Sequence, residues 1–153
     1  MKTNVMRILD QKKINYKSYD YSKSDVISGI DVASVLNQNP NQVFKTLVTV
    51  SNNKKYYVFD IPVNKELDLK KAAISVNEKS IEMVKSKDLL ALTGYIHGGC
   101  SMIGMKKQFP TIIDDSAKNY ETIIFSAGKI GYQVELRLED LKKVIDYKIC
   151  DLC

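Results

Sequence analysis

The clearest hydrophobic pattern in the chain runs from Val43 to Val50, where branched and aromatic residues predict a β-strand. A polar turn follows over Ser51-Asn52-Asn53. The segment Lys55–Val63 is again apolar and carries Pro62 near its end, so we expect it to return as the second strand of a hairpin. This hairpin is the predicted centre of a sheet.

The remaining elements follow from apolar spacing, which has a period near 3.6 in helices and 2 in strands. Helices are expected over Asn4–Gln11, Ile30–Leu36, Leu67–Ile74, Lys87–Thr93 and Leu138–Ile145. Further strands are expected over Ile14–Tyr21, Thr111–Ile113, Thr122–Ser126 and Tyr132–Leu136. The segment Asn77–Val84 predicts irregular structure or a short helix. Because helices lie irregularly between hairpin strands, the pattern favours an α+β fold with a mixed or antiparallel sheet.

Length and composition indicate a soluble protein with one domain, residues 1–153. No apolar run approaches the roughly 18 residues that span a membrane, and the N-terminal segment lacks the pattern of a signal peptide. We therefore expect a cytoplasmic protein that does not bind a membrane. The net charge of +5 favours an anionic partner such as nucleic acid.

A glycine-rich loop, Gly94–Asp115, is the first candidate for chemistry. Gly99 and Gly104 have the spacing of a P-loop, but Met105 stands where that motif needs lysine. The adjacent Gly98-Gly99 pair does not fit a dinucleotide-binding fingerprint either. Two interpretations remain open: a connector with turn glycines, or a loop whose backbone N–H groups hold a carbonyl or an oxyanion.

Lys45 is the second candidate, because it is a charged residue inside the strongest apolar strand. Alternation places Lys45 on one face with Val43, Leu47 and Thr49, and both faces of this strand are largely apolar. The ammonium group either reaches solvent or points into a pocket, where it would suit a phosphate, a carbonyl oxygen or a carboxylate.

The histidine and the cysteines give no specific catalytic pattern. His97 is the single histidine, so a Ser-His-Asp or Cys-His mechanism would need it, with Cys100 or Ser101 as nucleophile. His97 and Cys100, together with Cys150 and Cys153, have acceptable local spacing for zinc. Free thiols in a reducing compartment are the simpler interpretation, so we expect no metal and no cofactor.

Four ordered segments resemble the YbaK/EbsC family of free-standing aminoacyl-tRNA deacylases, which are related to the editing domain of bacterial prolyl-tRNA synthetases. The segments are NQVFKTLV, DLKKAA, TGYIHGGCSMIGMKKQFPTIID and FSAGKIGYQVEL. The resemblance implies a mixed, mostly antiparallel, barrel-like sheet flanked by short helices. It implies hydrolysis of misacylated tRNA, with Cys-tRNA(Pro) the best match, and prolyl-tRNA synthetase as a further partner.

The resemblance also implies roles for single residues. Lys45 matches the essential lysine of the family, expected to hold the aminoacyl-adenosine end of tRNA. Gly98 and Gly99 match the loop whose backbone contacts the substrate. Further substrate contacts are expected from Tyr21, Ser126, Cys100 and Ser101.

One position departs from the family pattern G-G-x-S-P-x-G, because Met102 stands where proline is usual. The family mechanism implies no protein nucleophile and no metal: the thiol of the substrate cysteine assists cleavage of its own ester, and the protein supplies positioning and oxyanion donors. Two alternatives stay open. One is a non-catalytic tRNA-binding or synthetase-associated module of the same fold, and the other is a zinc-stabilised interaction domain.

Overall fold

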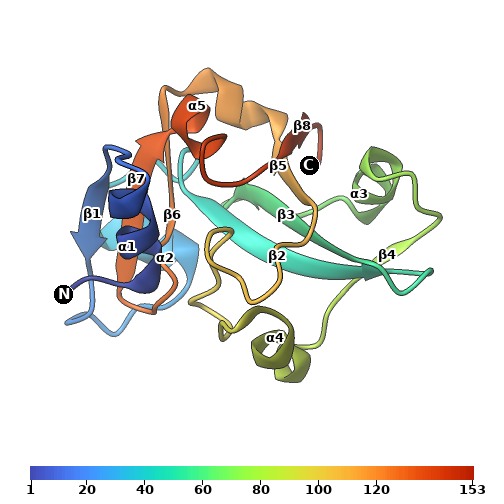
Figure 1. Cartoon of the computed structure of the whole chain (residues 1–153), viewed down its shortest axis with the longest axis horizontal. Coiled ribbons are helices and arrows are strands. Elements are labelled where there is room, and N and C mark those ends of the chain that lie inside the picture. Colours follow the sequence, from blue (N-terminus) through green and yellow to red (C-terminus); the bar gives the residue numbers. More distant parts are fainter.

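The hairpin of β2 (Phe44–Ser51) and β3 (Tyr56–Pro62) lies at the centre of the larger of two sheets in the computed structural model, which describes residues 1–153. Its turn is held by Ser51, whose Oγ accepts hydrogen bonds from the N–H groups of Asn53 and Lys55. The two strands pair antiparallel, which confirms the predicted hairpin. In Figure 1 it forms the long ribbon that crosses the middle of the molecule.

Three short strands complete the larger sheet in the order β4-β2-β3-β5-β8. They are β4 (Ile81–Met83), β5 (Thr111–Asp114) and β8 (Lys148–Cys150). The prediction for Asn77–Val84 is wrong in type, since buried Ile81 pairs with Ser51 and begins a strand. The strand β8 was not expected. It pairs parallel with β5, a partner far away in sequence, so local periodicity carries little trace of it.

The smaller sheet is antiparallel and has the order β1-β7-β6. Its strands are β1 (Lys17–Asp20), β6 (Thr122–Ser126) and β7 (Tyr132–Arg137). A single parallel bridge between Val43 and Ile124 joins the two sheets. The α+β class with mostly antiparallel pairing is therefore confirmed, but the strands do not close into a barrel.

Four of the five expected helices are confirmed with small shifts of their ends. They are α1 (Asn4–Gln11), α2 (Gly29–Val35), α3 (Leu69–Ser75) and α4 (Ser86–Thr93). Thr3 caps α1 by accepting a hydrogen bond from Met6 N–H, and Gly94 ends α4 with φ +83°.

The last predicted helix, Leu138–Ile145, is too long, because α5 covers only Leu138–Leu141. Beyond it, Val144 N–H bonds to the carbonyl of Leu141 three residues back, so the chain continues as tight turns. A short 3₁₀ helix, η1 (Asp115–Asn119), was not expected either. The buried apolar residues of both segments, Ala117 in η1 and Leu141 and Ile145 in the last predicted helix, belong to the main group of buried side chains.

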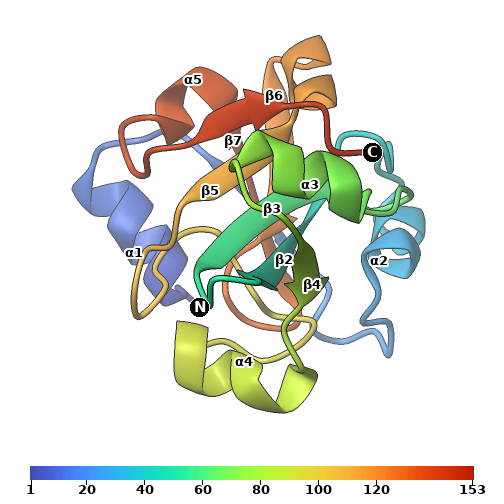
Figure 2. The same ribbon diagram turned by 90° about the vertical axis from the view of Figure 1, so that its right-hand side faces the viewer.

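Two main groups of buried side chains hold these layers together. The larger lies between α1, the smaller sheet and α5, with Val5, Phe125 and Leu141 among its members. The second lies between the hairpin and α3 and contains Phe59 and Ala72. Figure 2 shows α3 across the hairpin and α4 below it. None of the helices has the length and apolar character needed to cross a membrane.

Candidate active site

A cavity of about 610 Å³ opens beside the N-terminal half of β2. Its walls come from β2, the start of α2 with the loop before it, the end of β6 and the glycine loop. Ten of its 18 lining residues are hydrophobic, and none is Asp or Glu. A mostly apolar hollow with a few polar groups is the usual form of a small-molecule site.

The cavity lies along an unpaired edge of β2. The strand pairs with β3 over Phe44–Val50, but on its other side β4 pairs only with Thr49–Ser51. β6 pairs with this segment only through an isolated bridge between Val43 and Ile124. Consequently five consecutive residues, 43–47, line the cavity, and side chains from both faces of the strand border the same space.

Lys45 is half-buried and lines this cavity. None of the five ion pairs in the chain involves it, so its ammonium group has no carboxylate partner. The pairing of β2 with β3 is regular from Phe44 to Val50, so alternation along the strand holds and Lys45 shares a face with Leu47 and Thr49. A free cation in a partly desolvated hollow favours an anionic or carbonyl oxygen.

The two loop glycines are placed differently. Gly98 lines the cavity with φ +90°, and its N–H makes no backbone hydrogen bond. Gly99 is buried, and its N–H already donates to the carbonyl of Ile96 at 3.0 Å. Of the two, Gly98 has the N–H available for a ligand. A Cβ at Gly98 would lie 2.8 Å from Ile27 Cγ2, so the close approach also requires glycine.

Three of the four other predicted contacts reach the cavity. Tyr21, Cys100 and Ser126 line it, whereas Ser101 is fully buried outside the lining and accepts a hydrogen bond from Ile103 N–H. Ser126 Oγ accepts a hydrogen bond from Gly128 N–H at 3.1 Å, which leaves the hydroxyl proton free to be donated. The cavity thus brings together side chains from β1's end, β6 and the glycine loop.

Cys100 does not present a ready nucleophile. Burial, and to a smaller extent the nearby Asp60, raise the pKa of its thiol to about 12. The group therefore stays protonated near neutral pH, and the thiolate, not the thiol, is the reactive form. His97 borders the cavity as an exposed residue of the loop.

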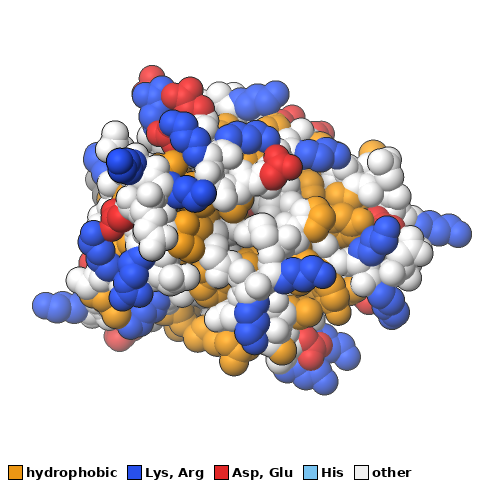
Figure 3. All heavy atoms as spheres, in the orientation of Figure 1, with side chains coloured by type: hydrophobic (Ala, Val, Ile, Leu, Met, Phe, Trp, Pro, Cys, Tyr) orange, Lys and Arg blue, Asp and Glu red, His pale blue; other side chains and the backbone are white.

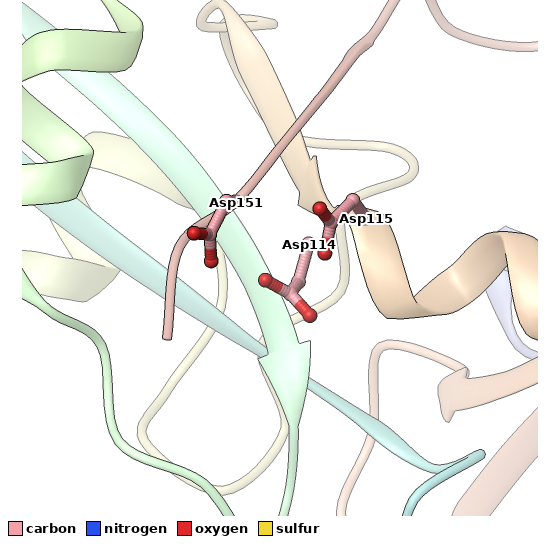
Figure 4. A group of neighbouring side chains, drawn as sticks. All are labelled: Asp114, Asp115 and Asp151. Carbon is pink, nitrogen blue, oxygen red and sulfur yellow. The ribbon is translucent and has the colours of Figure 1, made fainter.

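The proposed zinc ligands do not converge. The single group of His, Cys, Asp and Glu side chains close enough to hold a metal consists of Asp114, Asp115 and Asp151, shown in Figure 4. Asp114 in this group is buried, and its two oxygens accept hydrogen bonds from Leu152 N–H and Ser116 N–H. Its carboxylate therefore fixes the C-terminal segment to the end of β5.

Two polar pairs at the cavity were not predicted. Thr46 lines the cavity and donates its hydroxyl proton to Asp60, which is 0% exposed on β3. Gln133 on β7 also lines it and accepts a hydrogen bond from Gln38 Nε2 at 2.9 Å. The sequence did carry one signal: Asp60 is an acidic residue within the apolar strand VFDIPV.

Comparison with known proteins places this geometry in context. The model of the aminoacyl-tRNA editing domain matches residues 25–144. The chain is 47% identical, over 99% of its length and 93% of that protein, to a protein of Enterococcus faecalis named as a candidate Cys-tRNA(Pro)/Cys-tRNA(Cys) deacylase, EbsC.

Solved structures share the fold at low sequence identity. One, described as a candidate trans-editing enzyme for prolyl-tRNA synthetase, has a TM-score of 0.82 at 18% identity and covers 99% of this chain and 98% of its own. Another, described only as a hypothetical protein, has a TM-score of 0.88 at 15% identity and covers 98% and 99%.

Proposed function

The chain belongs to the aminoacyl-tRNA editing domain family, and from this premise we propose that it hydrolyses the ester of misacylated tRNA, with cysteine on tRNA(Pro) as substrate. The observation that carries the proposal is the unpaired ammonium of Lys45 inside a cavity of about 610 Å³. Small-molecule sites occupy roughly 300 to 1,000 Å³, which suits an aminoacyl-adenosine end.

Lys45, Gly98 and Ser126 have distinct roles in the proposed reaction. The ammonium of Lys45 holds the aminoacyl-adenosine end, whose ester carbonyl becomes an oxyanion when it is attacked. The free N–H of Gly98 and the hydroxyl of Ser126 are donors that border the same cavity. One such donor typically contributes about 3 kcal/mol to the transition state.

The nucleophile in the proposed reaction comes from the substrate. The thiol of Cys100 is protonated, so it is a poor attacking group. In cysteinyl-tRNA the sulfur of the substrate attacks its own ester carbon and closes a four-membered thiolactone, while the bond from that carbon to the ribose oxygen breaks and the ribose oxygen takes the thiol proton. Water then opens the thiolactone and releases free cysteine, which completes the hydrolysis. The cavity contributes by holding the ester in the conformation that brings sulfur and carbon together.

Met102 does not change the lining of the cavity. Its side chain is 0% exposed and belongs to the main group of buried residues, outside the cavity wall. The departure from the family pattern therefore alters the packing beneath the loop. This placement removes the reason for preferring a non-catalytic module of the same fold.

The partner in this proposal is tRNA, in the cytoplasm where translation takes place, and prolyl-tRNA synthetase is proposed as an associated protein. The chain's +5 charge supports capture of a polyanion. The Enterococcus relative is named for two tRNAs, so the tRNA body is a variable that the experiment must include.

Release of amino acid from charged tRNA tests the proposal. Purified protein is expected to release cysteine from Cys-tRNA(Pro), and Lys45→Ala is expected to lower kcat/KM by about 100-fold or more. The exposed Lys70→Ala has the same change in net charge and is expected to stay within about twofold of the unmodified protein. The panel includes alanine and serine on tRNA(Pro) and cysteine on tRNA(Cys). Absence of turnover on every charged tRNA would sink the proposal.

A further inference from the structure

The charge balance of the cavity raises a question about its substrate. Lys45 is a cation in the lining, and no Asp or Glu lines the cavity. An aminoacyl ester brings its own α-ammonium group, so two positive charges would share one poorly solvated hollow. Like charges in such a place repel each other strongly. A carboxylate close behind the wall would offset this repulsion.

Asp60 is the acidic residue that meets this need. It lies on β3 opposite Thr46 of β2, and its side chain is 0% exposed. One carboxyl oxygen is 2.5 Å from Thr46 Oγ1, while the other, Oδ2, is buried with no hydrogen-bond partner. A buried carboxyl with a single neutral partner is costly, so the presence of this group calls for an explanation.

The hydrogen bond to Thr46 connects Asp60 with the cavity. Among the side chains of the lining that make hydrogen bonds, Thr46 is the one bonded to a carboxyl group. Glu135, an acidic residue of the smaller sheet, is instead bonded to Tyr19 and Thr122, which lie outside the lining. Asp60 is thus linked to the cavity by a hydrogen bond from the Thr46 hydroxyl, and it also lies close to Cys100 of the lining.

The direction of this hydrogen bond decides whether the hydroxyl of Thr46 acts as a donor or as an acceptor toward the cavity. An ionised carboxylate only accepts, so the hydroxyl proton of Thr46 is donated to Asp60 and the lone pairs of Oγ1 remain. Such an oxygen accepts a hydrogen bond from an ammonium group. Burial raises the pKa of Asp60 to about 7, so its carboxyl ionises near neutral pH and does so more readily when a cation binds nearby.

We propose that Asp60 is a positioning residue that acts through Thr46 to bind the α-ammonium group of the aminoacyl ester. The pair then selects substrates with a free, charged amino group over substrates whose amino group is acylated and neutral. This inference rests on the proposed function, and it adds a determinant of the substrate class that the side chain of the amino acid does not supply.

A comparison of Cys-tRNA(Pro) with N-acetyl-Cys-tRNA(Pro) tests the inference, with the rate of spontaneous hydrolysis subtracted. The unmodified protein is expected to prefer the free amine by about tenfold or more in kcat/KM, mainly through KM. Asp60→Asn and Thr46→Val are each expected to bring this ratio to within about twofold of one. The double variant is expected to add nothing further, because both changes remove the same interaction.

A second buried carboxyl provides the matched control. Asp114→Asn alters a carboxylate that holds backbone N–H groups away from the cavity, so its ratio between the two substrates should equal that of the unmodified protein. Circular dichroism establishes that each variant is folded. If Asp60→Asn lowers turnover of both substrates equally and preserves the ratio, the residue is merely structural and the inference is wrong. If no aminoacyl-tRNA is hydrolysed at all, it is the proposed function that fails.

Discussion

The roles of single residues at the cavity follow from whether their polar atoms already have a hydrogen-bond partner within the chain. Lys45 has no carboxylate partner, and Gly98 keeps a free N–H. Ser101 and Gly99, which lie near Gly98 in the loop, have polar atoms that already bond within the chain. The difference between a ligand-facing residue and a structural one is therefore a difference in unused donors and acceptors.

The buried carboxyl of Asp60 makes stability depend on pH in an unusual direction. Burial raises its pKa from 3.8 to about 7, so the folded protein binds this proton more tightly than the unfolded chain does. The stabilising effect of protonation is complete below about pH 4 and is lost as pH rises toward 7. The contribution of Asp60 to stability is measured by urea unfolding of Asp60→Asn and of the unmodified protein between pH 5 and 8.

Relative to the unmodified protein, the free energy of unfolding of Asp60→Asn is expected to rise by on the order of 3 kcal/mol from pH 5 to pH 8. A free-energy difference between the two proteins that stays constant from pH 5 to pH 8 would contradict the prediction. The outcome also bears on the selectivity experiment, because it shows that Asp60→Asn is a folded protein at the pH of the assay.

At the scale of elements, the C-terminal strand depends on contacts with residues distant in the sequence, which its local sequence pattern does not predict. β8 pairs parallel with β5, and Leu152 just beyond it is 0% exposed within the group of side chains under α3. Asp114 accepts the N–H of Leu152 at 2.9 Å, and Lys71 forms an ion pair with Asp151. A segment of this kind is part of the core although it stands near the end of the sequence.

Leu152→Ala is accordingly expected to destabilise the protein by about 3 kcal/mol, the usual cost of a cavity left by a buried leucine. Ile74→Ala serves as the control, because Ile74 lies on α3 in the same region but is 75% exposed. It should change stability by less than about 0.5 kcal/mol. The test compares the urea midpoints of the two variants. If both substitutions lower the midpoint equally, the C-terminal segment is not packed as described.

At the scale of the whole molecule, the proposed function gives the basic surface and the cavity separate tasks. Figure 3 shows the face of the molecule that is seen in Figure 1, with Lys and Arg side chains spread around it and fewer acidic side chains between them. Five of the chain's basic side chains form ion pairs with carboxylates, which leaves most of its 23 Lys and Arg free to meet phosphates. In the proposed function the cavity holds only the aminoacyl end of the tRNA.

Salt should therefore weaken capture of tRNA without slowing the chemical step. Between about 50 and 200 mM salt, KM for Cys-tRNA(Pro) is expected to rise about tenfold or more, while kcat changes less than about twofold. A cysteinyl ester of adenosine, which lacks phosphates, is the control, and its KM should hardly respond. A KM for full-length tRNA that is insensitive to salt would show that the basic surface does not bind the nucleic acid.

The sequence by itself determined the features that depend on neighbouring residues. Apolar alternation predicted the hairpin and the face of Lys45, and helical spacing with a capping glycine predicted α4. The glycine density of the loop pointed to the place where backbone approaches the cavity. Side-chain periodicity and turn chemistry act over a few residues, so they can be recognised without the fold.

Only the tertiary structure decided what depends on distant partners. The strands β4 and β8 pair with strands that are distant in the sequence, and α5 covers only Leu138–Leu141 although Ile145 packs into the same group of buried side chains as Leu141. The hydrogen bond between Thr46 and Asp60, 14 residues later, connects a residue of the cavity lining with a buried carboxyl group. Chain order does not encode such juxtapositions locally, since they result from the packing of one surface against another.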